Sequence, residues 1–193
     1  MKKLMSVLMI TAMLGLGGCA TTSFQPMVAA LTQTQYKNEL PDLLLKAENG
    51  DAMMQVRLSY RLARGWGTVD GQPDMEGSMK WLQRAVDQNS MGAMAALAGR
   101  YAYGMYGVAK DEIKAREINE KVLKAYELTN GLSFALWERR ELATTITTLG
   151  YFSSSEHNDT NAAVAGYCLA LKINPAQEQA KHNLQALSRK CQA

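Results

Sequence analysis

The stretch SMGAMAALAGRYAYGMYGV, residues 90–108, decides the fold of this chain. Its second half, 99–108, holds three glycines and three tyrosines, and Tyr101 and Tyr103 alternate as they would in a β-strand. The same residues also fit the end of a helix followed by a glycine-rich turn. Whether the pattern occurs elsewhere in the chain separates these two interpretations.

A second copy of the pattern, NGDAMMQVRLSYRLARGWG, lies at residues 49–67. The copies are 41 residues apart in the first helix, 40 apart at Gly67 and Gly107, and 37 apart after the turn. The change from 40 to 37 places a three-residue loop insertion at 71–73. The strand alternation is short and is missing from the other copy, so the strand interpretation fails. The aligned pairs include Ala52 with Ala93, Tyr60 with Tyr101, Gly67 with Gly107 and Asp74 with Asp111.

Each copy predicts a helix, a glycine-rich turn and a second helix. Asp74 and Asp111 stand where an N-cap residue accepts the free N–H groups of the helix that follows. Gly104 and Gly107 suit turn positions with positive φ. The positions expected to face inward are Ala52, Val56, Tyr60, Ala63, Met75, Met79 and Leu82 in the first copy, and Ala93, Leu97, Tyr101, Ile113, Ile118 and Val122 in the second.

The shared pattern, A-x₃-[LV]-x₃-Y-x₃₋₄-G-x-G-[TV] and then D-x₃-[AS]-x₂-[WI]-x₂-[KR], resembles the Sel-one-like repeat. That family is related to the tetratricopeptide repeat. The resemblance implies an all-α fold, a short right-handed α-solenoid of stacked helix hairpins. The repeat domain is expected over 37–193, with units near 51–88 and 92–126, a degenerate unit over 131–173 and a capping helix over 176–190.

The degenerate unit is similar to a tetratricopeptide repeat. Leu149 and Gly150 resemble the leucine-glycine pair of that repeat's first helix, and a residue pattern typical of the second helix follows. One extra residue between the two halves predicts a longer loop near 153–159. The second-helix pattern consists of Ala163, Tyr167, Ala170 and Pro175, and the capping helix is expected to turn Leu184 and Leu187 inward.

The N-terminal sequence, MKKLMSVLMITAMLGLGGCA, is typical of a secretory signal. Two lysines precede an apolar run, Leu4–Leu16, that is shorter than the ~20 residues of a membrane-spanning helix. Residues 16–19, LGGC, resemble the bacterial lipobox, which implies removal of 1–18 and acylation of Cys19, as in a palmitate-bearing lipoprotein; an incidental cysteine is the alternative. In lipoproteins of this kind, Ala20 in place of Asp implies the outer membrane rather than retention in the inner membrane. The chain is expected to face the periplasm. Residues 19–36 are expected to hold the lipidated cysteine, a polar tether at 21–25 and a helix starting at Pro26.

Charge and cysteine content limit the possible partners. The net charge of +3 falls to +1 without the signal, so no nucleic-acid partner is expected. Cys168 and Cys191 remain, and a disulfide between them is left open. If one helix runs on to residue 190, the two cysteines lie on the order of 15 Å apart at ~1.5 Å per residue, whereas a disulfide requires Cα atoms within ~7 Å.

The sequence predicts no enzyme, metal site or cofactor. His157 lies beside Glu156 and Asp159, a trio that could bind a metal, but no further ligand stands at a suitable spacing. His182 is expected on a helix surface. No Ser-His-Asp or Cys-His arrangement is indicated.

One cluster suggests a binding surface. Arg57, Arg61 and Arg64 follow each other at i, i+4 and i+7, and Trp66 and Tyr106 lie in the neighbouring turns. Such a basic stripe could hold an acidic segment of a partner, and a solvated helix face is the alternative. A second contact is expected at Trp137 with Arg139 and Arg140, because Arg and aromatic side chains dominate interface energies.

These features together predict a lipid-anchored periplasmic adaptor that binds another envelope protein. An immunity protein that neutralises a toxin delivered to the periplasm is the alternative, and a hydrolase is a third. A neighbouring gene for a secreted effector would favour immunity.

Overall fold

The computed structural model describes residues 21–66, 68 and 70–191, and in this part of the chain all regular structure is helical. The all-α prediction is thereby confirmed. The helices are α2 (Thr21–Glu48), α3 (Ala52–Ala63), α4 (Met75–Asp87), α5 (Met91–Tyr103), α6 (Glu112–Leu128), α7 (Leu136–Ser155), α8 (Thr160–Ile173) and α9 (Glu178–Ala186).

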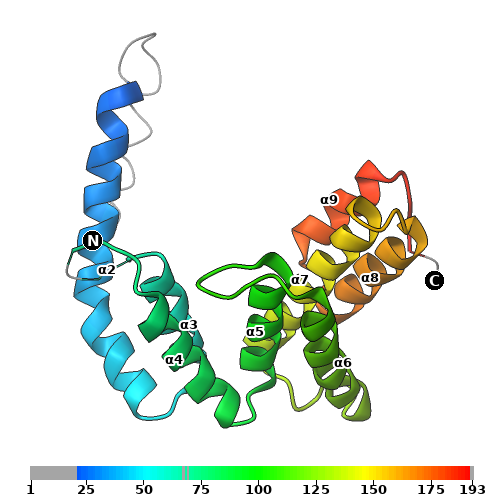
Figure 1. The fold of residues 1–193 in the computed structure, drawn as a ribbon, viewed down its shortest axis with the longest axis horizontal. Coiled ribbons are helices and arrows are strands. Elements are labelled where there is room, and N and C mark those ends of the chain that lie inside the picture. Colours follow the sequence, from blue (N-terminus) through cyan, green and yellow to red (C-terminus); the bar gives the residue numbers. More distant parts are fainter. Residues whose placement is uncertain (1–20, 67, 69, 192–193) are drawn as a thin grey trace, which may run out of the picture.

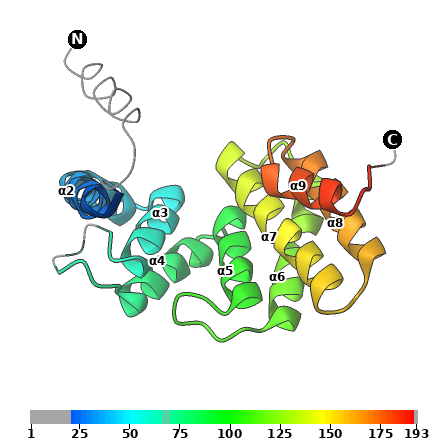
Figure 2. The ribbon, with the colours of Figure 1, turned by 90° about the horizontal axis from the view of Figure 1, so that it is seen from above.

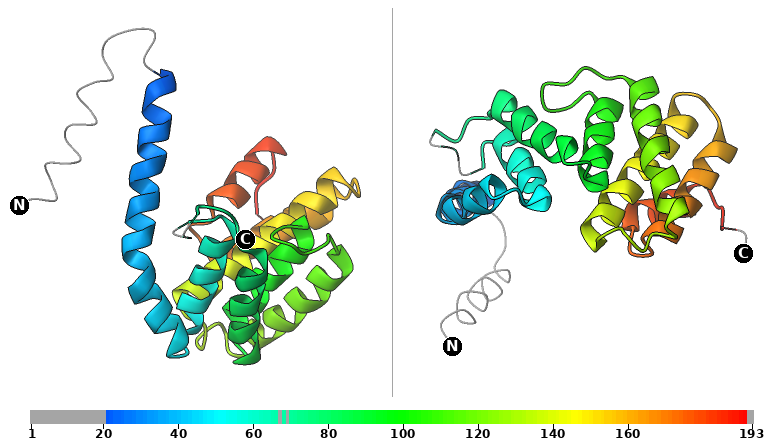
Figure 3. Two further views of the ribbon diagram at one scale, coloured as in Figure 1. Left: turned by 60° about the vertical axis from the view of Figure 1, so that its left-hand side comes forward. Right: turned by 90° about the horizontal axis from the view of Figure 1, so that it is seen from below.

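Helix pairs stack side by side along the molecule, from α2 at one end to α9 at the other (Figure 1). α5 packs against its own partner α6 and also against α7 of the next pair. The same order is visible from above (Figure 2), and the first turns of α2 project beyond the other helices (Figure 3). The arrangement is that of a short α-solenoid, in which each unit buries its apolar face against a neighbour.

The predicted helix starts and turns are confirmed. The carboxylate of Asp74 accepts a hydrogen bond from the backbone N–H of Gly77 at 2.8 Å, and that of Asp111 accepts one from Lys114 at 2.9 Å. Gly104 and Gly107 have φ angles of 65° and 81°. The stretch around Tyr101 is thus the end of α5 and its turn.

A shared core joins the first two pairs. Ala93 is fully buried beside Val56 and Leu82, and Ala52 is half-buried at the edge of the same cluster. The predictions for Met75 and Ile113 are wrong, because their side chains are 38% and 74% exposed. The buried stripe of α6 instead consists of Ala115, Asn119 and Val122, at helical spacing.

The third pair has the expected core and a different connection. Tyr167 is buried against Gly150, where an added methyl group would lie 3.0 Å from the ring. The longer loop predicted near 153–159 is wrong, because α7 continues to Ser155. Ser153 is buried, and its hydroxyl donates to the Leu149 carbonyl at 3.0 Å, so the extra residue extends the helix.

The N-terminal segment also differs from expectation. α2 begins at Thr21 and continues to Glu48, so the tether at 21–25 is helical and no break separates it from the repeat domain at 37. Residues 1–18 and Cys19 lie outside the described residues. None of the helices in the described part combines the length and the low polarity that spanning a bilayer requires.

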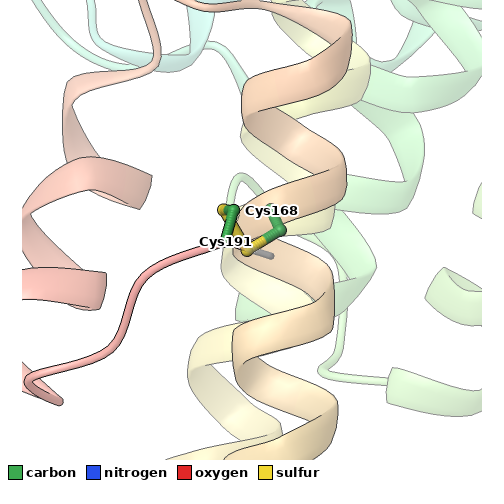
Figure 4. Close-up of a disulfide and its surroundings, with 2 residues drawn as sticks. All are labelled: Cys168 and Cys191. Carbon is green, nitrogen blue, oxygen red and sulfur yellow. A yellow bond between two sulfur atoms is a disulfide. The ribbon is translucent and has the colours of Figure 1, made fainter. Parts of the chain in front are cut away.

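The C-terminal segment folds back on α8. α9 ends at Ala186, short of the predicted residue 190, and Ser188 has a φ of 50° in the left-handed region. The reversed tail brings Cys191 to Cys168, with Cα atoms 5.4 Å apart, and the two form a disulfide (Figure 4). The estimated separation of 15 Å required a longer helix.

Candidate functional site

Five of the predicted binding residues line one cavity of about 320 Å³. They come from α3, from the turn after it and from α7, while α2 adds Tyr36. We call this the basic cavity. The predicted residues that line it are Arg57, Arg61, Arg64, Trp66 and Trp137, whereas Tyr106 lines the neighbouring cavity.

Arg61 does not belong to an open basic stripe. Its side chain is buried, forms an ion pair and hydrogen bond with Glu39 of α2, and lies 4.8 Å from the ring centre of Tyr36. Arg57 lies 3.9 Å from the same carboxylate. Hydrogen bonds from Gln35 and Arg61 hold the pKa of Glu39 below its usual value. Glu39 of α2 therefore neutralises part of the positive charge of Arg57 and Arg61.

Trp66 contacts both Tyr36 and Arg64 in the wall of the basic cavity. The rings of Trp66 and Tyr36 stack with centres 4.9 Å apart and an angle of 7°. The Arg64 guanidinium lies 4.8 Å from the Trp66 ring centre and is exposed. Such stacking restricts both the indole and the guanidinium to one geometry.

A second cavity, of about 270 Å³, adjoins the first and shares Tyr60, Arg64 and Glu141 with it. We call this the central cavity. It is lined by the first helices of three pairs, α3, α5 and α7, and by the turn that carries Tyr106. Arg100 also lines it, although only 1% of its surface is exposed.

Burial shifts the pKa values of three ionisable side chains of this cavity. Burial raises the pKa of the half-buried Glu141 carboxyl, which accepts a 3.2 Å hydrogen bond from the Tyr60 hydroxyl. Burial also raises the pKa of Tyr60 and lowers that of Arg100. Glu141, Tyr60 and Arg100 therefore lie in a part of the cavity wall that is largely shielded from water.

A third cavity, of about 270 Å³, adjoins the central cavity on the side towards α9, and no charged side chain lines it. It shares Tyr103, Thr144 and Thr148 with the central cavity. We call it the neutral cavity, and the three cavities together the groove. Its remaining lining residues are Thr147, Tyr151, Gln177, Gln179 and Asn183.

Of the second predicted contact, only Trp137 lines the groove. Trp137 is half-buried in the basic cavity and packs over Gly92 at the start of α5. Arg139 donates to the Phe134 carbonyl at 3.3 Å, and neither Arg139 nor Arg140 lines the groove.

The three side chains around His157 that could have bound a metal make other contacts. His157 lies 3.0 Å from a Glu112 oxygen, Glu156 pairs with Lys110, and Asp159 caps α8. Among the described residues no group of three or more potential metal-ligating side chains converges. Neither His157 nor the exposed His182 lines the groove.

Sequence reasoning missed Tyr36, Arg100 and Glu141. Arg100 stands in the alanine-rich buried face of α5, where a charged residue is a signal in itself. The sequence gives no comparable indication for Glu141, because its hydrogen-bond partner Tyr60 is 81 residues away along the chain.

Comparisons with known proteins give a partial likeness. No family model matches the chain, and no curated protein matches it. Among solved structures the chain is similar to a Sel1 repeat protein from Oxalobacter formigenes, with 26% sequence identity and a TM-score of 0.47. The likeness covers 77% of this chain and 98% of that one.

Proposed function

We propose that this protein is a lipid-anchored, periplasm-facing outer-membrane adaptor that binds another envelope protein in the groove and catalyses no reaction. The observation that carries the binding role is the groove itself, because three adjoining cavities follow one another across α3, α5, α7 and α9. A preformed surface of this kind loses little conformational entropy when a partner binds.

The anchor is supported by sequence. Cys19 follows a lipobox-like LGG and precedes the first residue of α2 by two positions. The lipid would hold the chain at the membrane, and α2 would connect it to the groove.

Photo-cross-linking in intact cells tests the binding role. A photoreactive phenylalanine replaces Tyr103, which is 46% exposed and lines two cavities of the groove. The matched control carries it at Ile113, which is 74% exposed on α6 and outside the groove. We expect one reproducible adduct with an envelope protein from position 103 and none from 113.

The identity of the adduct then separates the two roles. A structural or secretion component supports an adaptor, whereas a toxin supports an immunity protein. Identical adducts from both positions, or none from position 103, would remove the groove from the function.

A further inference from the structure

The groove holds a buried cation, Arg100, that no carboxylate of the described residues neutralises. The Arg100 guanidinium donates to the hydroxyls of Ser59 and Ser78, both at 3.0 Å, and to the Met79 sulfur at 3.4 Å. Its Nε is buried without a hydrogen-bond partner. Among the described residues no carboxylate forms an ion pair with it, and hydroxyls supply only partial compensation for a buried charge.

A second unneutralised cation lies beside it. Arg64 also has no carboxylate ion pair within the described part of the chain. The Tyr106 ring centre lies 5.6 Å from the Arg64 guanidinium carbon and 5.2 Å from that of Arg100. Both guanidinium groups therefore lie close to the same Tyr106 ring. Arg61, one turn before Arg64, differs because it is paired with Glu39.

The repeat alignment shows that packing does not require these charges. Residues 57, 61 and 64 are arginines in the first copy and Ala98, Ala102 and Met105 in the second. Arg100 of the second copy corresponds to Ser59 of the first. Each copy thus contributes one unpaired arginine to the same cavity at a position where the other copy has an uncharged residue.

We propose that the groove binds an extended peptide segment of its partner that places one acidic side chain against Arg64 and Arg100. This inference rests on the proposed function. The carboxylate would supply a negative partner to two guanidinium groups that have none among the described residues, and guanidinium groups form strong, directional bonds with carboxylates. The neutral cavity next to this point offers exposed hydroxyl and amide groups, among them those of Tyr151 and Gln179, that match the donors and acceptors of a peptide backbone.

Glu141 restricts the segment to a single acidic side chain. Glu141 lines the same cavity, its carboxylate accepts a hydrogen bond from the Tyr60 hydroxyl, and among the described residues it forms no ion pair. A second acidic residue of the ligand would meet this like charge. The groove therefore selects one acidic residue within a neutral segment and disfavours an acidic run.

The test measures binding of short fluorescent peptides, blocked at both ends, to the purified full chain by anisotropy. The peptide pool has Glu at one central position in a mixed Ser, Thr, Gln and Ala background, and matched pools have Gln or Lys there. We expect the Glu pool to bind about tenfold more tightly than either control, because hydrogen bonds to charged groups contribute most.

Variants with opposite expected effects sharpen the test. Arg64→Gln weakens binding of the Glu pool about tenfold, and Glu141→Gln strengthens it by roughly threefold through loss of the like charge. The matched control is Arg84→Gln, since Arg84 is exposed and stacks on Trp81 at 4.5 Å outside the groove. This control variant retains wild-type binding.

Equal binding of the Glu and Gln pools, or equal losses in R64Q and R84Q, would overturn the acidic specificity. A cross-link from position 103 in the same cells would then leave the proposed function standing. Failure of both the peptides and the cross-link would remove the binding role together with its specificity.

Discussion

At the scale of single residues, two buried arginines of the groove are held in different ways. Arg61 has the Glu39 carboxylate, whereas Arg100 has only hydroxyls and a sulfur. The hydroxyls do not depend on Arg100, because Ser59 donates to the Val56 carbonyl at 2.7 Å and Ser78 to the Ser59 carbonyl at 2.6 Å. Arg100 therefore adds a charge to the interface without being needed to satisfy its polar groups.

Replacing Arg100 by Met tests this interpretation. Met fills a similar space without a charge to desolvate, so we expect the free energy of unfolding to stay equal or to rise by about 1 kcal/mol. Acidic-peptide binding should fall at least about tenfold. Denaturant unfolding and anisotropy measure the two effects. A large loss of stability would instead mean that Arg100 is a structural clamp between α3, α4 and α5.

Glu141 links stability to pH. Burial raises the pKa of its carboxyl above the ordinary 4.5, so the folded protein holds this proton more tightly than the unfolded chain does. The stabilisation is complete below pH 4.5 and is lost as pH rises through the raised pKa. Of its charged and polar neighbours, Tyr60 and Arg140 oppose this shift without reversing it.

Glu141→Gln should accordingly be more stable than the wild type at neutral pH. Gln still accepts the Tyr60 hydrogen bond and has no charge to desolvate. The difference should vanish below pH 4.5, where Glu141 is protonated in the wild type. Thermal unfolding of both proteins across this pH range is the measurement, and a constant difference would contradict the assignment.

At the scale of helices, the cap of the stack depends on a reversal of the chain. α9 has only nine residues, and Leu184 on it is buried against the third pair. The tail beyond Ala186 returns to α8, where the Cys168–Cys191 disulfide closes a segment of 23 residues. The bond restricts the unfolded tail and keeps the short helix on the stack.

Cys191→Ser should therefore lower the free energy of unfolding by about 3 kcal/mol, the size expected for a loop of this length. Thermal unfolding with and without a reducing agent measures the effect. Reduction should bring the wild type to the level of the variant and should leave the variant unchanged. Equal unfolding temperatures of the oxidised wild type and the variant would show that packing alone retains α9.

At the scale of the whole molecule, α2 would connect the proposed anchor to the groove. This helix has 28 residues, which corresponds to about 42 Å at ~1.5 Å per residue. Its first turns project beyond the stack (Figure 3). Further along the helix, Tyr36 and Glu39 contact Arg61 of α3. One continuous helix thus leads from the segment after Cys19 to the edge of the basic cavity.

Cys19→Ala should abolish incorporation of labelled fatty acid and shift the protein from the membrane fraction to the soluble one. Each buried CH₂ contributes ~0.8 kcal/mol to membrane affinity, so loss of the acyl chains removes the attachment. The matched control, Cys168→Ala with Cys191→Ala, should keep both the label and the membrane association. Labelling that persists in the Cys19 variant would refute the anchor.

The sequence by itself determined the helix pairs, their caps and the glycine turns, because N-caps and positive-φ turns depend on residues a few positions apart. Only the tertiary structure decided the course of α2 over Arg61, the reversal after α9 and the meeting of Arg64, Arg100 and Glu141 in one cavity. These features depend on how helices from distant parts of the chain pack, such as Tyr60 against Glu141 across 81 residues, and local patterns do not encode that register.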